Sequence, residues 1–385
     1  MSQDIRDFVT PSCHLLALGE PTHQEPAFGR IRNELFAQLA DHGFRSIALE
    51  TDRVAALAVN DYVQGGSGDL DTLLREGFSH GFGEQDANRR LVGWMRDYNR
   101  HRPPAQRLAF HGFDAPLENT CAPSPRTYLE HARDYLRLDL DIAGLTGDDA
   151  RWSRAEAVLD AAMSPGATAE AERLRSIADD MLTTLHARAP ELIAATSRDE
   201  WFRARTHLTA GLGLLRYHRQ SARPLEPSPR IAGLLATRDA LMAQNLLDIR
   251  STEQERGATL VFAHNLHLQR NLSIWQLEDR GAEWFCAGAI VASLVGERYV
   301  CVAGSLGRSE TLGLEDPAPD TYEGLLQSRI PGWGLEAATA PPSAATRTDT
   351  HPRQGYFPLD RATLDAMDAV LHIADGTTAG TPAAI

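Results

Sequence analysis

The sequence contains no lysine, and all 38 of its basic residues are arginines. Without a lysine ε-amino group the chain forms no Schiff base, which excludes pyridoxal phosphate attachment and imine-based catalysis. A phosphate-binding P-loop is excluded as well, because that motif needs its lysine. The sequence also lacks a Gly-x-Ser-x-Gly elbow, which argues against a common serine hydrolase. No His-Glu-x-x-His motif of the zinc proteases occurs.

Cysteine is scarce and scattered. The four cysteines are Cys13, Cys121, Cys286 and Cys301, and no two of them form a Cys-x-x-Cys pair. This spacing argues against a disulfide framework and against a zinc site built from thiolates. Three of them, Cys13, Cys286 and Cys301, lie in apolar stretches, where a thiol behaves as a small buried hydrophobic side chain.

Positive charge and long apolar runs are also in short supply. The formal net charge is −14, which argues against a nucleic-acid or anionic-membrane partner. No apolar run is long enough to cross a bilayer. The first residues lack the basic and apolar regions of a signal peptide, so we expect a cytoplasmic location. With 43% hydrophobic and 23% charged residues, the 385-residue chain has an ordinary globular composition.

Apolar runs of strand length alternate with helical patterns along the chain. An α/β fold follows, with a mostly parallel sheet and crossover helices on its faces. A helix is predicted over 24–43, where an apolar stripe ends at a glycine. The predicted strands are 12–19, 45–49, 107–113, 258–263, 298–303 and 366–373, the last of which closes the sheet.

The stretch from about 125 to 222 has a different character. It is almost entirely helical in pattern, with breaks at 164–166 and 189–190. We interpret it as a helical insertion or cap that forms a cleft within a single domain over 1–385. A loop rich in proline, threonine and alanine is predicted over about 335–353, and the segment 268–275 fits no pattern.

Four of the predicted strands end at residues with acid–base chemistry. Because the carboxyl ends of parallel strands share one edge of the sheet, these side chains are expected to converge. The residues at the four ends are, in chain order, Glu20 and His23, Glu50, Asp114, and His264 and His267.

Such a group of carboxylates and imidazoles suits general acid–base catalysis. A carboxylate orients an imidazole and sets its tautomer, and the imidazole then takes a proton from water. A second imidazole, or an arginine, stabilises the oxyanion that forms. The same ligands suit a divalent metal with open coordination positions.

Each of these residues also has a purely structural explanation. A histidine after a strand is often a hydrogen-bond partner within its loop. Glu20 and Glu50 suit helix starts, where the helix dipole favours negative charge. His264 and His267 suit the first turn of a helix. The recurrence at four strand ends favours a shared site over four separate structural roles.

The segments around these positions resemble the erythromycin esterase family in their order and spacing, from about residue 10 to about residue 305. The segments that carry the resemblance are 19–23, Arg32, 43–50, 94–99, 112–114, 238–245 and 263–268. The resemblance implies a parallel α/β core with a helical part and a deep cleft. It also implies a hydrolase for an ester or lactone of a small molecule, macrolide-like or another natural product, without a serine nucleophile.

The resemblance further implies residue roles. His23 is the general base that activates water, and Glu20 and Glu50 orient or tune it. Arg32, His264 and His267 complete the site by binding the carbonyl group or its oxyanion. The candidates for binding other parts of the substrate are Asp114, Trp94 and Asn265.

Three further expectations concern cofactors and alternatives. No cofactor is required, but the family leaves a divalent metal open, and its candidate ligands are His23, Glu50 and His264. The same site could serve a natural-product tailoring enzyme that performs acyl transfer, cyclisation or elimination. A third hypothesis is that the protein binds a metal or haem without catalysis.

Overall fold

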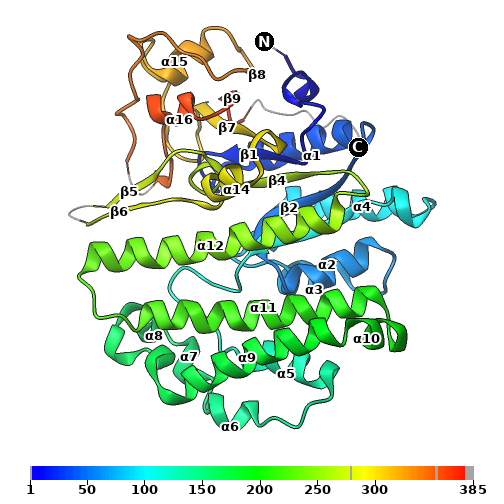
Figure 1. Ribbon diagram of the computed structural model, residues 1–385. Helices are drawn as coiled ribbons and strands as arrows, with labels where there is room; N and C mark the ends of the chain where they lie inside the picture. The colour runs from blue at the N-terminus through cyan, green and yellow to red at the C-terminus, as the bar shows by residue number, and fades with distance from the viewer. Residues whose placement is uncertain (1, 278–279, 352–353, 378–385) are drawn as a thin grey trace.

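The structure, a computed structural model, describes residues 2–277, 280–351 and 354–377. A seven-stranded sheet lies above the long helices α12 (Pro227–Glu253) and α11 (Arg198–Ser221) in the view of Figure 1. The strand order is β3-β2-β4-β1-β7-β9-β8, and every neighbouring pair is parallel except the antiparallel pair β8 and β9. The predicted α/β fold with a mostly parallel sheet is thereby confirmed. The strands are β1 (Leu15–Glu20), β2 (Phe44–Asp52), β3 (Ala109–Asp114), β4 (Ala258–His264), β7 (Tyr299–Arg308), β8 (Trp333–Ala337) and β9 (Ala369–Asp375).

Both faces of the sheet are buried, which explains why its strands are continuous apolar runs. In β1, Leu16 and Leu18 enter the core on one face, whereas Leu15 and Ala17 enter the core on the other. The first face is covered by α1 (Pro26–Ala40), α2 (Ala55–Val63), α3 (Leu70–Gly77) and α4 (Asp86–Asn99). The second face is covered by α12 (Pro227–Glu253), α14 (Ala287–Val295) and α15 (Tyr322–Gln327).

The first helix shows how local sequence sets its own boundaries. Helix α1 begins where the Glu25 carboxylate accepts the Ala27 N–H and a proline occupies the first position, both of which favour a helix start. It ends at Ala40 rather than at Gly43 as predicted. Gly43 has φ +93°, a left-handed conformation that suits glycine, and it leads directly into β2.

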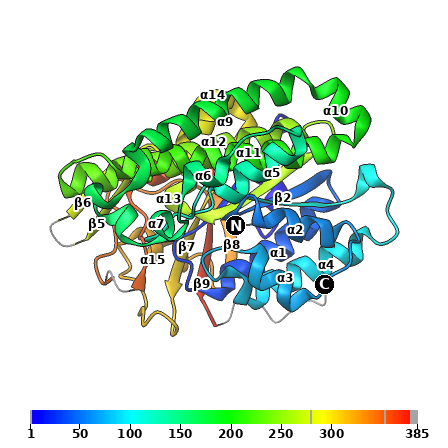
Figure 2. The same ribbon diagram turned by 90° about the horizontal axis from the view of Figure 1, so that it is seen from below.

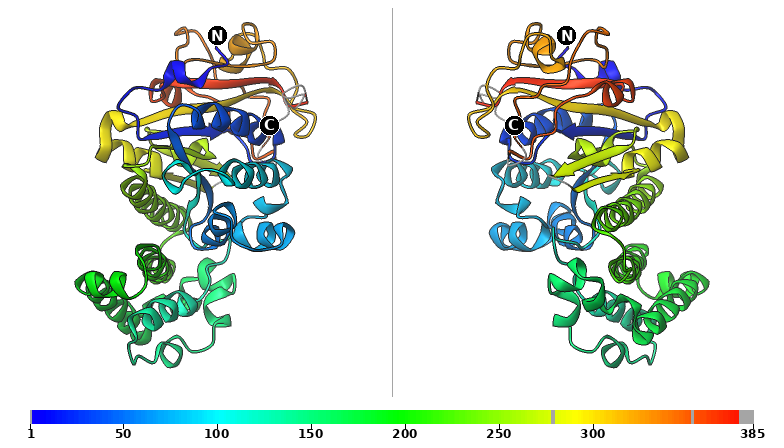
Figure 3. Two further views of the ribbon diagram at one scale, coloured as in Figure 1. Left: turned by 90° about the vertical axis from the view of Figure 1, so that its right-hand side faces the viewer. Right: turned by 90° about the vertical axis from the view of Figure 1, so that its left-hand side faces the viewer.

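A second helical layer lies on the far side of α12 from the sheet (Figures 2 and 3). Its side chains form a hydrophobic core of their own, with Leu129, Leu174 and Leu208 fully buried. Helix α11 also packs against α12, so α12 joins the two layers. The helices of this layer are α5 (Arg126–Leu136), α6 (Ile142–Thr146), α7 (Ala150–Ser153), α8 (Glu156–Leu159), α9 (Ala169–Ala187), α10 (Ala189–Ala195) and α11 (Arg198–Ser221).

Two strand assignments need correction. The strand predicted over 366–373 does not close the sheet, because β8 pairs antiparallel with β9 and takes the edge. The unassigned segment after 268 holds the start of a hairpin, β5 (Ser273–Leu277) with β6 (Arg280–Trp284). Strand β8 and the two strands of this hairpin are each five residues long, and part of their surface is exposed. They therefore lack the long apolar runs of the inner strands.

Two further short α-helices are α13 (Asn265–Leu268), directly after β4, and α16 (Arg361–Asp365), before β9. None of the described helices combines the length and the apolar character that a membrane span requires.

Candidate active site

The four strands that end in acid–base residues are neighbours in the sheet, in the order β3-β2-β4-β1. Glu20 is the register partner of His264, which places the ends of β1 and β4 side by side. The six side chains predicted at the strand ends therefore come from one continuous edge. Ion pairs and hydrogen bonds connect five of them through two shared carboxylates, Glu50 and Glu20.

His23 is the most exposed member of this group. Its Nδ1 lies 2.8 Å from Glu20 Oε1, and its Nε2 lies 3.8 Å from Glu50 Oε1. The imidazole ring packs against Phe82 and His264, at centroid distances of 5.0 and 5.3 Å. Its side chain is 35% exposed, compared with 10% for Glu20 and 5% for Glu50.

The two carboxylates keep the His23 imidazole protonated. Burial lowers the pKa of His23, but the charges of Glu50 and Glu20 outweigh burial and raise it to about 9. Burial raises the pKa of Glu20, and the hydrogen bond from His23 acts in the opposite direction. At the exposed edge of the site, the His23 imidazole and the buried Glu20 carboxylate therefore share a proton.

Glu50 is the central carboxylate of the site. Its Oε2 accepts the backbone N–H of His264 at 2.9 Å, and its Oε1 lies 3.4 Å from His267 Nε2 and 3.2 Å from Arg238 Nη2. Burial acts to raise its pKa, but the charges of His267, His23 and Arg238 outweigh burial and hold the pKa well below its usual range. Glu50 is thus an ionised anchor for the surrounding cationic groups.

His267 is held by a residue that the sequence analysis did not select, Asp239 on α12. Asp239 Oδ1 lies 2.9 Å from His267 Nδ1 and accepts the N–H of Ala287, and its Oδ2 accepts the indole N–H of Trp284 at 2.7 Å. The Asp239 carboxylate directs His267 Nε2 toward Glu50. Burial lowers the pKa of His267, but Asp239 and Glu50 outweigh it and raise the pKa, which favours the imidazolium.

Asp114, predicted to bind substrate, is fully buried and already has protein partners. Arg238 donates to both of its oxygens, and His80 Nε2 lies 3.0 Å from Oδ2. The charge of Arg238 outweighs burial and lowers the pKa of Asp114. The structure therefore places Asp114 behind Arg238 as its anchor, rather than at an open surface.

His264 has both ring nitrogens engaged. Nδ1 accepts the N–H of Leu266 at 3.1 Å, so Nε2 carries the proton and donates to the carbonyl of Pro21 at 3.1 Å. Burial, together with the charge of His23, lowers its pKa to about 3. His264 is a neutral ring that holds the loop after β1.

The predicted metal ligands His23, Glu50 and His264 do not fit a metal ion, because His264 has no free nitrogen lone pair in this arrangement. Within residues 2–277, 280–351 and 354–377, no group of three or more His, Cys, Asp or Glu side chains is arranged to hold one.

Asn265 ties the site to the rest of the sheet. Its amide exchanges two hydrogen bonds of 2.9 Å with the backbone of Gly304 on β7. A Cβ on Gly19 would lie 2.1 Å from Asn265 Oδ1, so the glycine at this position is needed for the amide to fit. Each end of its amide therefore already has a backbone partner, and the binding of substrate by Asn265 stays a prediction.

Arg32 and Trp94 lie farther from the imidazoles. Arg32 is buried, donates to Asn33 Oδ1 and stacks on Phe262 at 4.9 Å. It meets the site through the nearby charge of Glu20 and through a small cavity that both side chains line. Trp94 packs on Phe36 and Tyr98, at centroid distances of 5.7 and 5.5 Å, between α1 and α4. Trp94 is therefore a packing residue and not part of the strand-end site, since the amphipathic α4 directs it toward the core.

Sequence reasoning missed Arg238, Asp239 and His80. Arg238 and Asp239 lie in the family-like segment 238–245, where two charged residues interrupt an apolar helix pattern, and this signal could have identified them. His80 gives no such signal. Its φ of +58°, uncommon for a non-glycine residue, becomes visible only in the folded chain.

The family model described as "Erythromycin esterase" matches residues 39–381. The chain belongs to the erythromycin esterase family. The match includes Glu50, Asp114, His264 and His267 and begins after the Glu20–His23 pair. Membership in this family points to hydrolysis of an ester or lactone. A search of curated protein sequences finds no match.

Solved structures share the fold of this erythromycin esterase family member. A Bacillus cereus protein has a TM-score of 0.72 at 17% identity, covering 96% of this chain and 90% of its own. A mutant of the erythromycin esterase EreC in its open conformation has a TM-score of 0.66 at 20% identity, covering 96% and 93%. A succinoglycan biosynthesis protein has a TM-score of 0.59 at 18% identity, covering 95% and 88%.

Proposed function

We propose that this protein hydrolyses an ester or lactone of a small molecule, with His23 as the base that activates water. The observation that carries the proposal is the position of His23. Its Nδ1 is paired with Glu20, its Nε2 has no partner within hydrogen-bond distance among the described residues, and its ring is the exposed member of an otherwise buried cluster. This is the arrangement of a general base with an orienting carboxylate.

The proposed reaction needs no covalent intermediate on the protein. Neutral His23 Nε2 takes a proton from water while the water oxygen attacks the substrate carbonyl. Glu20 stabilises the imidazolium through Nδ1. The tetrahedral intermediate then collapses, the ester C–O bond breaks, and the leaving alkoxide takes the proton back from His23 Nε2. The products are a carboxylic acid and an alcohol.

His267 is the residue that we propose for stabilising the oxyanion. Its raised pKa favours a charged ring, and Asp239 fixes its orientation. A cation held in a buried site stabilises a developing negative charge more strongly than it would in water. The other candidates from the sequence already donate hydrogen bonds elsewhere. Arg32 donates to Asn33, and His264 donates to the loop after β1.

A small cavity next to the two carboxylates offers room for water beside the partners of His23. Its volume is about 20 Å³, which suits one water molecule. Glu20, Arg32 and Glu50 line it, together with Asn88. Asn88 Oδ1 is buried and has no hydrogen-bond partner among the described residues, so it offers an acceptor to a water proton.

The substrate class that we propose is a macrolide-like lactone or a comparable natural-product ester. It is supported by the family of the chain and by the name of its structural neighbour EreC. Acyl transfer, cyclisation and elimination remain distinguishable from hydrolysis by their products, because only hydrolysis adds the elements of water.

The test is turnover of a panel of macrolactones and simple esters in ¹⁸O-labelled water, with product mass as the readout. Hydrolysis is expected to place one ¹⁸O in the acid product. His23→Asn is expected to lower the rate by about 10²–10⁴-fold, the usual contribution of a general base. His101→Asn, at an exposed position, is the matched control. Full activity in His23→Asn, or products without ¹⁸O, would contradict the proposal.

A further inference from the structure

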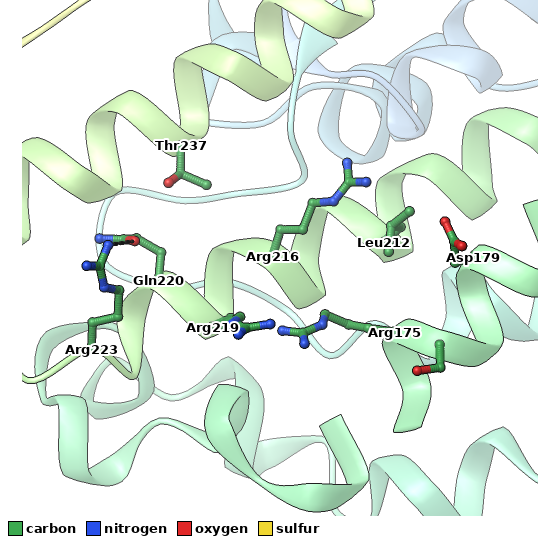
Figure 4. A pocket seen from close by; sticks show the side chains of 9 residues that line it. Arg175, Asp179, Leu212, Arg216, Arg219, Gln220, Arg223 and Thr237 are labelled. Atoms are coloured by element: carbon green, nitrogen blue, oxygen red, sulfur yellow. Dashed lines mark hydrogen bonds between the residues drawn. The ribbon is translucent and has the colours of Figure 1, made fainter. Parts of the chain in front are cut away.

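A cavity lies between α9, α11 and α12, outside the strand-end site. Its volume is about 720 Å³. It shares no lining residue with the cluster around Glu50. Figure 4 shows side chains from all three helices around it. Those that matter for its chemistry are Arg175, Asp179, Arg216, Arg219, Arg223 and Thr237.

The cavity is strongly cationic in a chain whose net charge is −14. Four arginines line it, and Asp179 is its one lining carboxylate. Glu172 lies next to this wall and forms ion pairs with both Arg175 and Arg219, at 3.5 Å to Arg219 Nη1. Even with both carboxylates counted, positive charge is in excess. This local charge opposes that of the whole protein.

Two of the guanidinium groups keep N–H donors without an acceptor in the described part of the protein, one of them buried and one exposed. Arg175 Nη1 is buried and has no hydrogen-bond partner among the described residues. Arg216 forms no hydrogen bond or ion pair within that part of the chain and is exposed to the cavity. In Figure 4 the guanidinium groups of Arg175 and Arg219 point toward each other. Glu172 supplies one negative charge to this pair, and it leaves Arg175 Nη1 and Arg216 without an acceptor among the described residues.

We propose that this cavity binds a small organic phosphate. Guanidinium groups donate two parallel N–H bonds to phosphate oxygens, which matches an arrangement of several arginines around one space. A volume of about 720 Å³ exceeds the needs of the phosphate group alone. Leu212 and Thr237 supply less polar wall for the organic part.

On α12 the cavity and the strand-end site are lined by consecutive residues. Thr237 lines the cavity, and the next residue, Arg238, donates to Glu50 and Asp114. The proposal concerns binding and does not depend on the hydrolytic function. If His23 did not act as a base, the proposal of phosphate binding would not be affected.

The test is titration calorimetry of the full chain with pyrophosphate and with inorganic phosphate, in a buffer of low ionic strength. The wild-type protein is expected to bind pyrophosphate more tightly than phosphate, because it carries more charge. Arg216→Gln is expected to weaken pyrophosphate binding about tenfold. The exposed side chain makes misfolding of this variant unexpected, and a thermal melt of each variant verifies this.

Arg173→Gln is the matched control, because it removes the same charge from an exposed position on α9 outside the cavity. It is expected to leave the affinity within about twofold of the wild type. The double variant Arg175→Gln, Arg216→Gln is expected to abolish binding. The absence of binding in the wild type, or an equal loss in Arg173→Gln and Arg216→Gln, would overturn the proposal.

Discussion

Removing the charge of Glu20 tests how the site tunes its proposed base. In Glu20→Gln the amide keeps the size of the side chain but removes the negative charge that lies 2.8 Å from His23 Nδ1. An anion next to an imidazole favours its protonated form and raises its pKa. The expected result is therefore a lower pKa for His23 in the variant.

The size of the shift follows from the contact. A neighbouring opposite charge moves a pKa by about 1–3 units, and each unit corresponds to about 1.4 kcal/mol. With the His23 pKa at about 9, roughly one ring in a hundred is neutral at pH 7. Glu50 remains in Glu20→Gln, so a fall of about 1–2 units is expected, which leaves roughly a tenth to a half of the rings neutral.

The assay is an NMR titration of the histidine ring Cε1–H signals over neutral and alkaline pH. The protein has 14 histidines, and the signal missing from His23→Asn identifies the one of interest. Glu84→Gln, an exposed glutamate without an ion pair among the described residues, is the charge-matched control. A His23 pKa that is the same in Glu20→Gln and in the wild type would refute this account of the site. In the wild type, hydrolytic kcat/KM is expected to rise with pH up to the His23 pKa, since only the neutral ring accepts a proton.

Three other predictions follow from the contacts of the site. Asp239→Ala leaves one imidazolium and two N–H groups buried without their acceptor, so it is expected to lower the free energy of unfolding by about 3–5 kcal/mol in chemical denaturation. Gly19→Ala places a Cβ against Asn265 and is expected to cost about 1–3 kcal/mol together with most of the activity. Its control, Gly93→Ala, has open space around the new Cβ within a helix and is expected to stabilise the protein by about 0.5–1 kcal/mol. An unchanged melting temperature in Gly19→Ala would show that the Asn265 contact is adaptable. Because His264 has no free nitrogen, dialysis against a chelator is expected to leave hydrolysis unchanged, and loss of activity that returns with added metal would contradict this.

The strand ends could be found in the sequence because inner parallel strands are easy to recognise. Each one is a short apolar run buried on both faces, so the first polar residue after it marks the sheet edge. Glu20, Glu50, Asp114 and His264 were located in this way. The edge strand β8 and the β5–β6 hairpin were not predicted, since strands that are short and partly exposed contain no such apolar run.

The role of each side chain depended on partners that are distant in sequence. His264 appeared available for catalysis, and only the carbonyl of Pro21 shows that its ring is occupied. Asn265 was predicted to bind substrate, and only the folded chain shows that Gly304 on β7 pairs with both ends of its amide. A hydrogen-bond partner more than 30 residues away leaves no trace in local periodicity.

By itself, the sequence determined the class of fold, the edge of the sheet that carries the acid–base residues, and the exclusion of lysine chemistry, because these follow from residue types and short-range patterns. The tertiary structure decided which imidazoles are free. It brought Arg238 and Asp239 from α12 against Glu50 and His267, and it left His23 as the exposed ring of a buried network. Protonation and orientation depend on charges within a few ångströms, and the distances between those charges are set by the packing of α12 on the sheet.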